Sequence, residues 1–406
     1  MPFFRRLTRS KAIAAVGSDS ARRSRLSHLH LFAIGWVYYL LIPILAGRLG
    51  LFESSDSFSL MRRFASPQDR WWPALMLYVV LLPLAFLAGN ALADRIPNLR
   101  GLRTPVAAPS QVLVPVYALA LLLTGYAARG NFFGGYSEDL DIAAVGPVST
   151  LQMCLVFQYL AARAEGLRST RWLGLLLLLS SVLLLGMGGR LYVLSTLVAI
   201  YVDWWKFRAS GPRARLRSLV AVILTPLAFG VVGMLRLGVF DLADLSFYIF
   251  AEPLFTSISA FTLMDGNGWA LLDTPRDFFS AFINLVPAAV WPGKTNYVIS
   301  LLDTSLNFEA PFGAISIVTS TIGNFGYLCG PLFLGFVGFV MGRTRRGTGT
   351  VAGRALYCYL CSLLPFMLFR DPFAVQIKVA LLGFVLIWVN RVIGIALETL
   401  PRVSRG

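Results

Sequence analysis

The sequence predicts an all-α protein, namely a polytopic membrane bundle of about ten to twelve transmembrane helices. Of its 406 residues, 57% are apolar and only 14% are charged, whereas about 25% of the residues of a soluble domain are charged. Apolar stretches of about 15–20 residues recur along the chain and are separated by short basic segments, as in helical membrane proteins. These observations exclude a soluble fold and a disordered chain.

Each apolar stretch gives one candidate membrane span. We expect spans at residues 30–47, 71–93, 111–128, 143–162, 172–187, 190–205, 218–235, 245–264, 277–292, 313–341, 355–369 and 374–391. Glu252, Pro253, Asp265 and Asp273 interrupt the apolar pattern between residues 245 and 292. This region is therefore compatible either with two spans or with an external subdomain of amphipathic helices.

The net charge of +16 has a topological explanation. If the first span starts in the cytoplasm, most basic residues fall in loops on that side, as the positive-inside rule requires, and most acids fall on the other side. The chain then divides into a cytoplasmic basic tail at 1–28, a single transmembrane domain at 29–393 with outward-facing loops at 236–312, and a cytoplasmic tail at 394–406. The charge therefore does not indicate a nucleic-acid partner.

Residues 172–205 predict a short helical hairpin. One continuous helix would rise about 51 Å and would put Arg171 and Lys206 on opposite sides, although both carry inward-type charge. The chain must turn back at Gly186–Gly189, because glycine supplies the backbone freedom that a reversal needs. Each arm then spans about 24 Å, less than the roughly 30 Å hydrocarbon core. Arg190 is therefore held below the outer surface, where an arginine marks a function by default; a snorkelling interfacial arginine is the alternative.

Three further cations lie at the outer ends of spans, and together with Arg190 they predict an anion site. These are Arg236, Lys294 and Arg370. A diphosphate headgroup is the natural ligand, because guanidinium groups bind phosphate oxygens bidentately. We expect Arg190, Arg236 and Arg370 to stabilise a departing diphosphate, with Lys294 as an additional binding residue. Such a site would work without a metal or another cofactor.

A carboxylate in the same region would accept a proton from an attacking hydroxyl group. Glu252 is the first candidate, because it lies in an apolar run that would make its carboxylate a better base. Asp241 and Glu309 follow. The alternative for Glu252 is a purely structural ion pair with one of the arginines.

Other motifs have structural interpretations. The glycines at 326, 330, 338 and 342 give two GxxxG spacings, which predict close helix packing. The only histidines, His28 and His30, lie at the cytoplasmic edge of the first span, so histidine catalysis on the outer face is excluded.

Several short motifs between residues 172 and 345 follow one another in a family-like order. They are Gly188-Gly189-Arg190, Arg236, Val286-Pro287, Trp291-Pro292-Gly293-Lys294, Pro311-Phe312-Gly313 with Ser316, and Gly323-Asn324-Phe325-Gly326 with Gly330. In this order the sequence resembles the O-antigen polymerases (Wzy-type oligosaccharide repeat-unit polymerases), relatives of the O-antigen ligases and of the shape, elongation, division and sporulation glycosyltransferases. The chain departs from the pattern at Ser320, where a glutamate is expected, so Glu309 or Glu252 would have to substitute for it.

The resemblance implies a GT-C-like fold and a polysaccharide polymerase of the bacterial inner membrane, with both termini in the cytoplasm. The implied reaction transfers an oligosaccharide from one undecaprenyl-diphosphate carrier to a second lipid-linked repeat unit at the periplasmic face, for a lipopolysaccharide or exopolysaccharide. It adds Gly189 and Asn324 to the candidate substrate-binding residues. The implied partners are donor and acceptor lipids in the bilayer; a chain-length-regulating co-polymerase is a further candidate.

Two rival functions stay open. An O-antigen ligase or another glycosyltransferase of the same superfamily would share the cation site but use a different acceptor. A lipid-linked oligosaccharide flippase or other transporter would instead line a translocation path with the cations. That interpretation favours charges spread through several helices at mid-depth, and few occur there.

Overall fold

The computed structural model describes residues 27–49, 70–97, 110–131, 142–208, 245–267, 275–287 and 290–399, together with residues 216, 220 and 231. Within these ranges the chain is helical and contains no strand, as predicted. The helices are α2 (His28–Trp36), α3 (Ile42–Arg48), α5 (Trp72–Arg95), α6 (Ser110–Ala127), α7 (Ile142–Glu165), α8 (Thr170–Gly186), α9 (Arg190–Phe207), α11 (Leu245–Asn267), α12 (Arg276–Leu285), α13 (Ile317–Arg346), α14 (Val351–Leu363), α15 (Met367–Arg370) and α16 (Phe373–Thr399). A π-helical turn, η1 (Val37–Leu41), joins α2 to α3, and η5 (Pro292–Tyr297) and η7 (Pro311–Gly313) are 3₁₀ turns.

Five of the described helical segments are long and apolar enough to cross a membrane. They are His28–Arg48, Trp72–Arg95, Val145–Glu165, Ile317–Gly349 and Phe373–Leu397. Three further apolar helices are shorter, namely Val112–Ala127, Thr170–Gly186 and Val351–Leu363. These segments fit a membrane protein, whereas the expected total of ten to twelve spans stays a prediction.

The structure excludes one of the two alternatives left open for residues 245–292. The predicted span at 277–292 is wrong, because α12 has only 10 residues and gives way to extended backbone at Val286. A helix that short rises about 15 Å and cannot cross the hydrocarbon core. Helix α16 continues to Thr399, beyond the expected end of the last span at residue 391, and the cytoplasmic tail at 394–406 stays a prediction. The span expected at 218–235 lies almost entirely outside the described residues.

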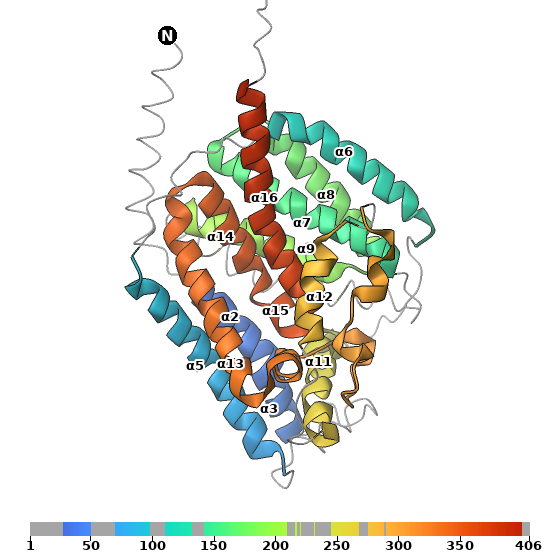
Figure 1. The fold of residues 1–406 in the computed structure, drawn as a ribbon, viewed down its shortest axis with the longest axis vertical. Helices are drawn as coiled ribbons and strands as arrows, with labels where there is room; N and C mark the ends of the chain where they lie inside the picture. Colours follow the sequence, from blue (N-terminus) through green and yellow to red (C-terminus); the bar gives the residue numbers. More distant parts are fainter. Residues whose placement is uncertain are drawn as a thin grey trace, which may run out of the picture.

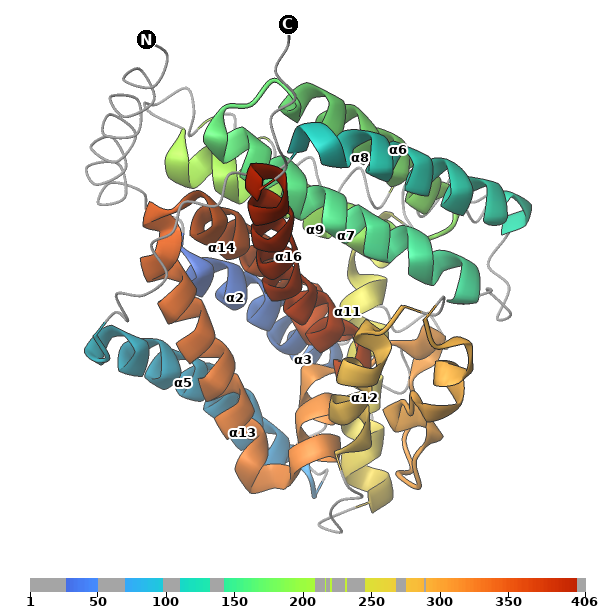
Figure 2. The same cartoon turned by 45° about the horizontal axis from the view of Figure 1, so that its top comes forward.

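The helices form two groups joined by a buried helix (Figures 1 and 2). α6, α7, α8 and α9 pack together in one group, and α5 packs along α13 in the other. Between them α14 contacts α2, α7, α9, α13 and α16, and every residue from Ala355 to Leu363 is buried. A 13-residue apolar helix is stable here because protein, rather than lipid, surrounds it.

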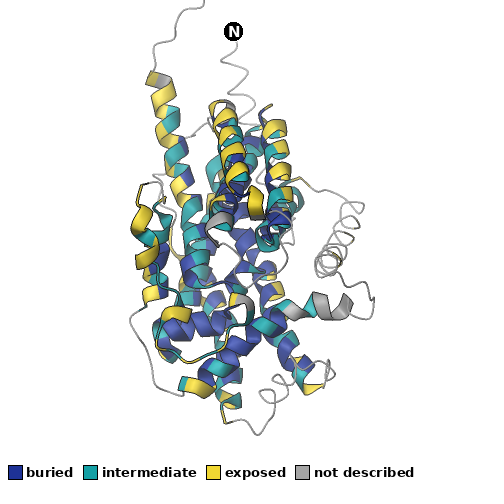
Figure 3. Ribbon diagram, turned by 90° about the vertical axis from the view of Figure 1, so that its right-hand side faces the viewer, coloured by how far each residue is buried: buried dark blue, intermediate teal, exposed yellow. Residues whose placement is uncertain are grey.

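Exposed residues gather on the outer helices, whereas buried residues fill the interior (Figure 3). Leu122 of α6, Leu178 of α8 and Trp388 of α16 are 71%, 61% and 66% exposed. In water such side chains would be costly to expose. A bilayer around the bundle removes that cost.

The GxxxG glycines of α13 lie against α5. A Cβ atom on Gly338 would come within 2.0 Å of the Phe86 carbonyl oxygen, and one on Gly342 within 2.6 Å of Ala93 Cβ. The prediction of close packing is confirmed for this pair. Gly326 does something different: its φ of 73° and ψ of 177° break the helix into two, a conformation that only glycine adopts readily.

Candidate functional site

The α8–α9 hairpin turns back at the predicted glycines. Gly188 has φ 85°, and the N–H of Gly189 donates to the Leu184 carbonyl at 2.7 Å. A Cβ atom on Gly189 would lie 2.8 Å from Leu184 Cδ2, so crowding favours glycine at position 189. At position 188 the positive φ favours glycine. The turn makes Arg190 the first residue of α9. The contact with Leu184 gives Gly189 a structural role, and its predicted substrate contact stays a prediction.

Gln152 of α7 ties both arms of the hairpin together. Its Nε2 donates to Ser181 Oγ of α8 and to Thr196 Oγ1 of α9, both at 2.8 Å, and its Oε1 accepts from Ser180 Oγ. The contacts lie at similar distances from the turn on the two arms, as expected for antiparallel helices. The arms have 17 and 18 residues and rise about 26 and 27 Å, still short of the roughly 30 Å core.

Three predicted residues from distant segments meet in one ion cluster, the Arg190–Glu252–Arg370 cluster. Arg190 Nη2 donates to Glu252 Oε2 at 2.6 Å, and Arg370 Nε donates to Glu252 Oε1 at 2.5 Å. Arg370 Nη1 also donates to Asp371 Oδ1 at 2.8 Å. The side chains of Arg190, Glu252 and Arg370 are 34%, 21% and 24% exposed, so an external ligand can reach them.

The two arginines, and not the apolar surroundings, decide the basicity of Glu252. Both guanidinium groups bond to its carboxylate and stabilise the ionised form, so the prediction that the apolar run makes it a better base is wrong. Burial opposes the charge of Arg370, but the carboxylates of Glu252 and Asp371 outweigh it and raise the pKa of this arginine well above its ordinary value. Arg370 is therefore always a cation. An incoming anion must compete with Glu252 for the same two guanidinium groups, so the site can exchange an internal carboxylate for a ligand phosphate.

Two prolines, Pro372 and Pro253, help to position Arg370 and Glu252. Pro372 disfavours a helical residue before it, so Asp371 is extended and α15 ends at Arg370. Pro253 has no N–H and leaves the Ile249 carbonyl of α11 without its helical donor. The Tyr38 hydroxyl, in the π-turn η1, donates to that carbonyl instead. This contact fixes α11, and hence Glu252, against the first helix.

Asp277, in the first turn of α12, holds the start of α16. Its Oδ2 accepts from Phe373 N–H at 2.8 Å and its Oδ1 from Ala374 N–H at 3.0 Å. Burial raises the pKa of Asp277 to about 6, although these two donors and Asn324 act in the opposite direction. Sequence reasoning missed this residue, whose only signal is its position at the start of the apolar stretch 277–292.

Asn324 is a buried structural residue in this arrangement and is only 2% exposed. Its Oδ1 accepts from Phe278 N–H at 2.9 Å, and its Nδ2 donates to Asp277 at 3.4 Å and to the Ser320 carbonyl at 2.9 Å. Its amide is thus occupied by protein groups, which corrects the expectation that it contacts substrate. Ser320, where the family resemblance implies a glutamate, is fully buried.

The other predicted residues do not join the Arg190–Glu252–Arg370 cluster within the described part of the chain. Lys294 Nζ donates to the carbonyls of Val286 at 2.6 Å and Asn284 at 3.2 Å, which close the C-terminal end of α12. Glu309 is exposed, and its backbone N–H donates to Thr262 Oγ1 at 2.9 Å. Arg236 and Asp241 lie outside the described residues.

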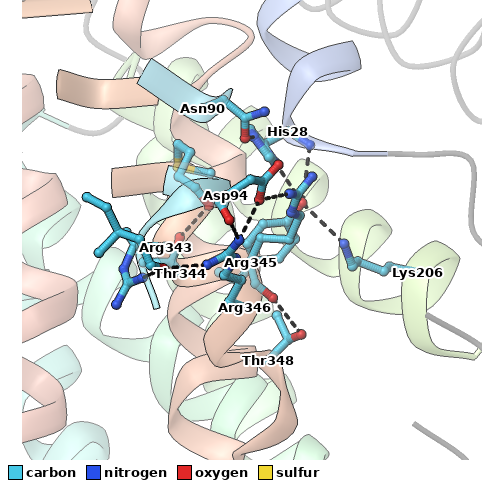
Figure 4. A network of polar contacts seen from close by, with 12 residues as sticks. His28, Asn90, Asp94, Lys206, Arg343, Thr344, Arg345, Arg346 and Thr348 are labelled. Carbon is cyan, nitrogen blue, oxygen red and sulfur yellow. Dashed lines mark hydrogen bonds and ion pairs between the residues drawn. The ribbon is translucent and has the colours of Figure 1, made fainter. Parts of the chain in front are cut away.

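A separate polar network lies near the opposite end of α9 (Figure 4). The Tyr357 hydroxyl accepts from Lys206 Nζ at 3.3 Å and bonds His28 Nδ1 at 3.2 Å, while His28 Nε2 donates to Asn90 Oδ1 at 2.9 Å. Asp94 nearby pairs with Arg345 at 2.6 Å. His28 belongs to α2 and is fully buried. Through Tyr357 it is linked to Lys206, at the end of α9 opposite to Arg190.

Neither a family model, nor a curated protein, nor a solved structure matches this chain. No group of three or more His, Cys, Asp or Glu side chains suited to a metal ion occurs among the described residues.

Proposed function

We propose that this chain is a membrane glycosyltransferase, a polysaccharide polymerase of the O-antigen (Wzy) type. It would transfer a growing oligosaccharide from one undecaprenyl-diphosphate carrier to the terminal sugar hydroxyl of a second lipid-linked repeat unit, at the periplasmic face of the bacterial inner membrane. The observation that carries the proposal is the convergence of Arg190, Glu252 and Arg370 from three distant segments. The order of motifs between residues 172 and 345 supports the choice of family.

In this reaction the acceptor oxygen attacks the anomeric carbon of the donor. A new carbon–oxygen bond forms, and the bond from that carbon to the diphosphate oxygen breaks, with its electron pair leaving on the diphosphate. Arg190 and Arg370 stabilise the charge that develops on the leaving group. Glu252 accepts the proton of the attacking hydroxyl group.

Ligand exchange at the cluster would link binding to activation of the base. Glu252 is shared by two guanidinium groups before substrate binds, at 2.6 and 2.5 Å. When a diphosphate takes over these donors, the carboxylate loses the charges that stabilise its ionised form. Glu252 then becomes a stronger base at the moment when the leaving group is in place.

Replacing Arg190 by alanine tests the proposal. In cells that depend on this chain, Arg190→Ala should abolish long-chain polysaccharide, while single repeat units still reach the surface and the protein level stays unchanged. Arg129→Ala is the matched control, because Arg129 is an exposed cation after α6 that stacks on Tyr126 at 3.9 Å. Unchanged chain length in Arg190→Ala would remove the proposed role; loss of surface single units would favour a flippase.

A purified reaction separates the polymerase from its nearest rival. Detergent-purified chain and one defined lipid-linked repeat unit should give products with two or more repeats on a polyprenyl diphosphate. If product formed only after an acceptor without that carrier was added, the chain would be a ligase instead.

A further inference from the structure

A cavity of about 610 Å³ opens at the end of the α8–α9 hairpin opposite to Arg190. It lies between the α7–α8 turn and the C-terminal end of α9. Four arginines line it, one from α7, one from the turn, one from α8 and one at the end of α9: Arg163, Arg168, Arg171 and Arg208. The function proposed above does not use any of them.

The walls of this cavity are fixed by backbone contacts. Gly166, with φ 72°, ends α7, and Leu167 N–H donates to the Ala162 carbonyl at 3.0 Å. Arg208 Nη2 donates to the Arg163 carbonyl at 2.8 Å, which ties the end of α9 to the end of α7. Thr170 opens α8 and also lines the cavity, so the positive end of a 17-residue helix adds to the field of the arginines.

Positive charge exceeds negative charge around the cavity. Asp203, 1% exposed, is the carboxylate that pairs with Arg163 at 3.4 Å, Arg208 at 3.3 Å and Arg354 at 2.5 Å. Arg168 and Arg171 are exposed and form no ion pair within the described part of the chain. Glu165, the nearest acid along α7, does not line the cavity. Four arginines therefore line the cavity, and Asp203 pairs with only two of them, Arg163 and Arg208. An anion would relieve the remaining repulsion.

We propose that this cavity binds the phosphate headgroup of an anionic phospholipid. The apolar surface next to it favours a lipid over a free phosphate ion. Trp172 lines the cavity and is 62% exposed, and the exposed face of α8 continues from it through Leu175 and Leu178. Headgroup and acyl chains would thus find a basic pocket and an apolar stripe on the same helix, with the tryptophan at the interface.

Native mass spectrometry of the full chain tests this proposal. The delipidated protein is titrated with phosphatidylglycerol, with zwitterionic phosphatidylcholine as the charge control and glycerol phosphate as the soluble phosphate arm. We expect the protein to retain phosphatidylglycerol. Its affinity should fall about five-fold in Arg168→Gln and in Arg171→Gln, and about 25-fold in the double variant that carries both changes. Both side chains are exposed, so these variants should fold.

The matched control is the double variant Arg95→Gln and Arg391→Gln. It removes the same charge from two exposed arginines outside the cavity and should keep full lipid affinity. Equal losses in the two double variants would overturn the proposal, because general charge would then explain binding. Binding of glycerol phosphate as tightly as phosphatidylglycerol would overturn the assignment to a lipid.

Discussion

Helix α9 carries an ion cluster at each end, and the two clusters differ in how they balance charge. At its N-terminal end Arg190 and Arg370 share Glu252, and Asp371 adds a second carboxylate. At its C-terminal end three arginines converge on Asp203 alone. Glu252 is 21% exposed, whereas Asp203 is 1% exposed.

The difference separates a cluster suited to ligand exchange from one suited to holding helices together. A partly exposed carboxylate can give up its partners to an incoming anion. A carboxylate that is buried and shared by α7, α9 and α14 cannot do so without leaving a buried charge unpaired. Charge at the two ends of a single helix can thus serve chemistry and architecture respectively.

Asp203→Asn should have the largest effect on stability, about 3 kcal/mol, because three arginines lose their shared partner, with some screening by solvent. Thermal unfolding in detergent, followed by size-exclusion chromatography, measures it. Asp94→Asn is the matched control, since Asp94 pairs with Arg345 and Arg346 but is 44% exposed, and should lose less than about 1 kcal/mol. Equal losses in the two variants would contradict the comparison.

Arg370→Lys should lower kcat/KM by about 10²–10³ fold, or about 2.7–4 kcal/mol of transition-state stabilisation. Lysine keeps the charge but loses the fork that joins Glu252 to Asp371. The assay is polymerisation of a purified lipid-linked repeat unit. Arg354→Lys, the same change at the Asp203 cluster, should leave turnover of the folded fraction unchanged, and a similar fall there would erase the functional distinction between the clusters.

Gly188→Ala should destabilise the hairpin by about 1–2 kcal/mol, because alanine is strained at the φ of 85°. Activity should fall further than stability, since the turn sets the position of Arg190. Gly146→Ala in α7 is the control, because a Cβ atom there meets nothing within 4 Å. Comparable thermal shifts in the two variants would show that the turn conformation is not restrictive.

Gln152→Leu should have the smallest effect on stability, about 1 kcal/mol, as for other side-chain hydrogen bonds within membranes. Gln158→Leu, on the same helix, loses its bonds to Asn390 at 2.8 and 3.1 Å and should cost a similar amount. Only the Gln152 variant should also lower polymerisation, since only Gln152 holds both hairpin arms. If the two variants had equal activity, the bonds of Gln152 to both hairpin arms would not be needed to position Arg190.

Sequence reasoning predicted most helices and the hairpin turn well, because apolar length and local glycines determine both. It also placed Arg190, Arg370 and Glu252 in one region, although their pairing required the fold. Asp203 was missed as the centre of a cluster because only Arg208 is close to it in sequence, whereas Arg163 and Arg354 come from distant helices, the latter 151 residues away. Topology alone accounts for the inward arginines in the sequence, and only the fold brings four of them around one cavity.

Two errors have local causes. The apolar residues at 277–292 suggested a span, but Pro287 and Pro292 limit the helix, and Asp277 bonds to the start of α16. Asn324 lies in a family-like motif, yet its amide connects buried backbone groups. Motif order locates a region, whereas the role of a residue depends on which neighbours the fold supplies.

The π-turn at Val37–Leu41 inserts one residue beyond what a regular helix needs. Each residue of an α-helix advances the azimuth by about 100°. Deleting Val37 would restore a regular turn and rotate the Tyr38 side chain by about that angle relative to α2, which would leave the Ile249 carbonyl without the Tyr38 hydroxyl. A single-codon deletion in the first helix would thus disconnect it from the helix that carries Glu252.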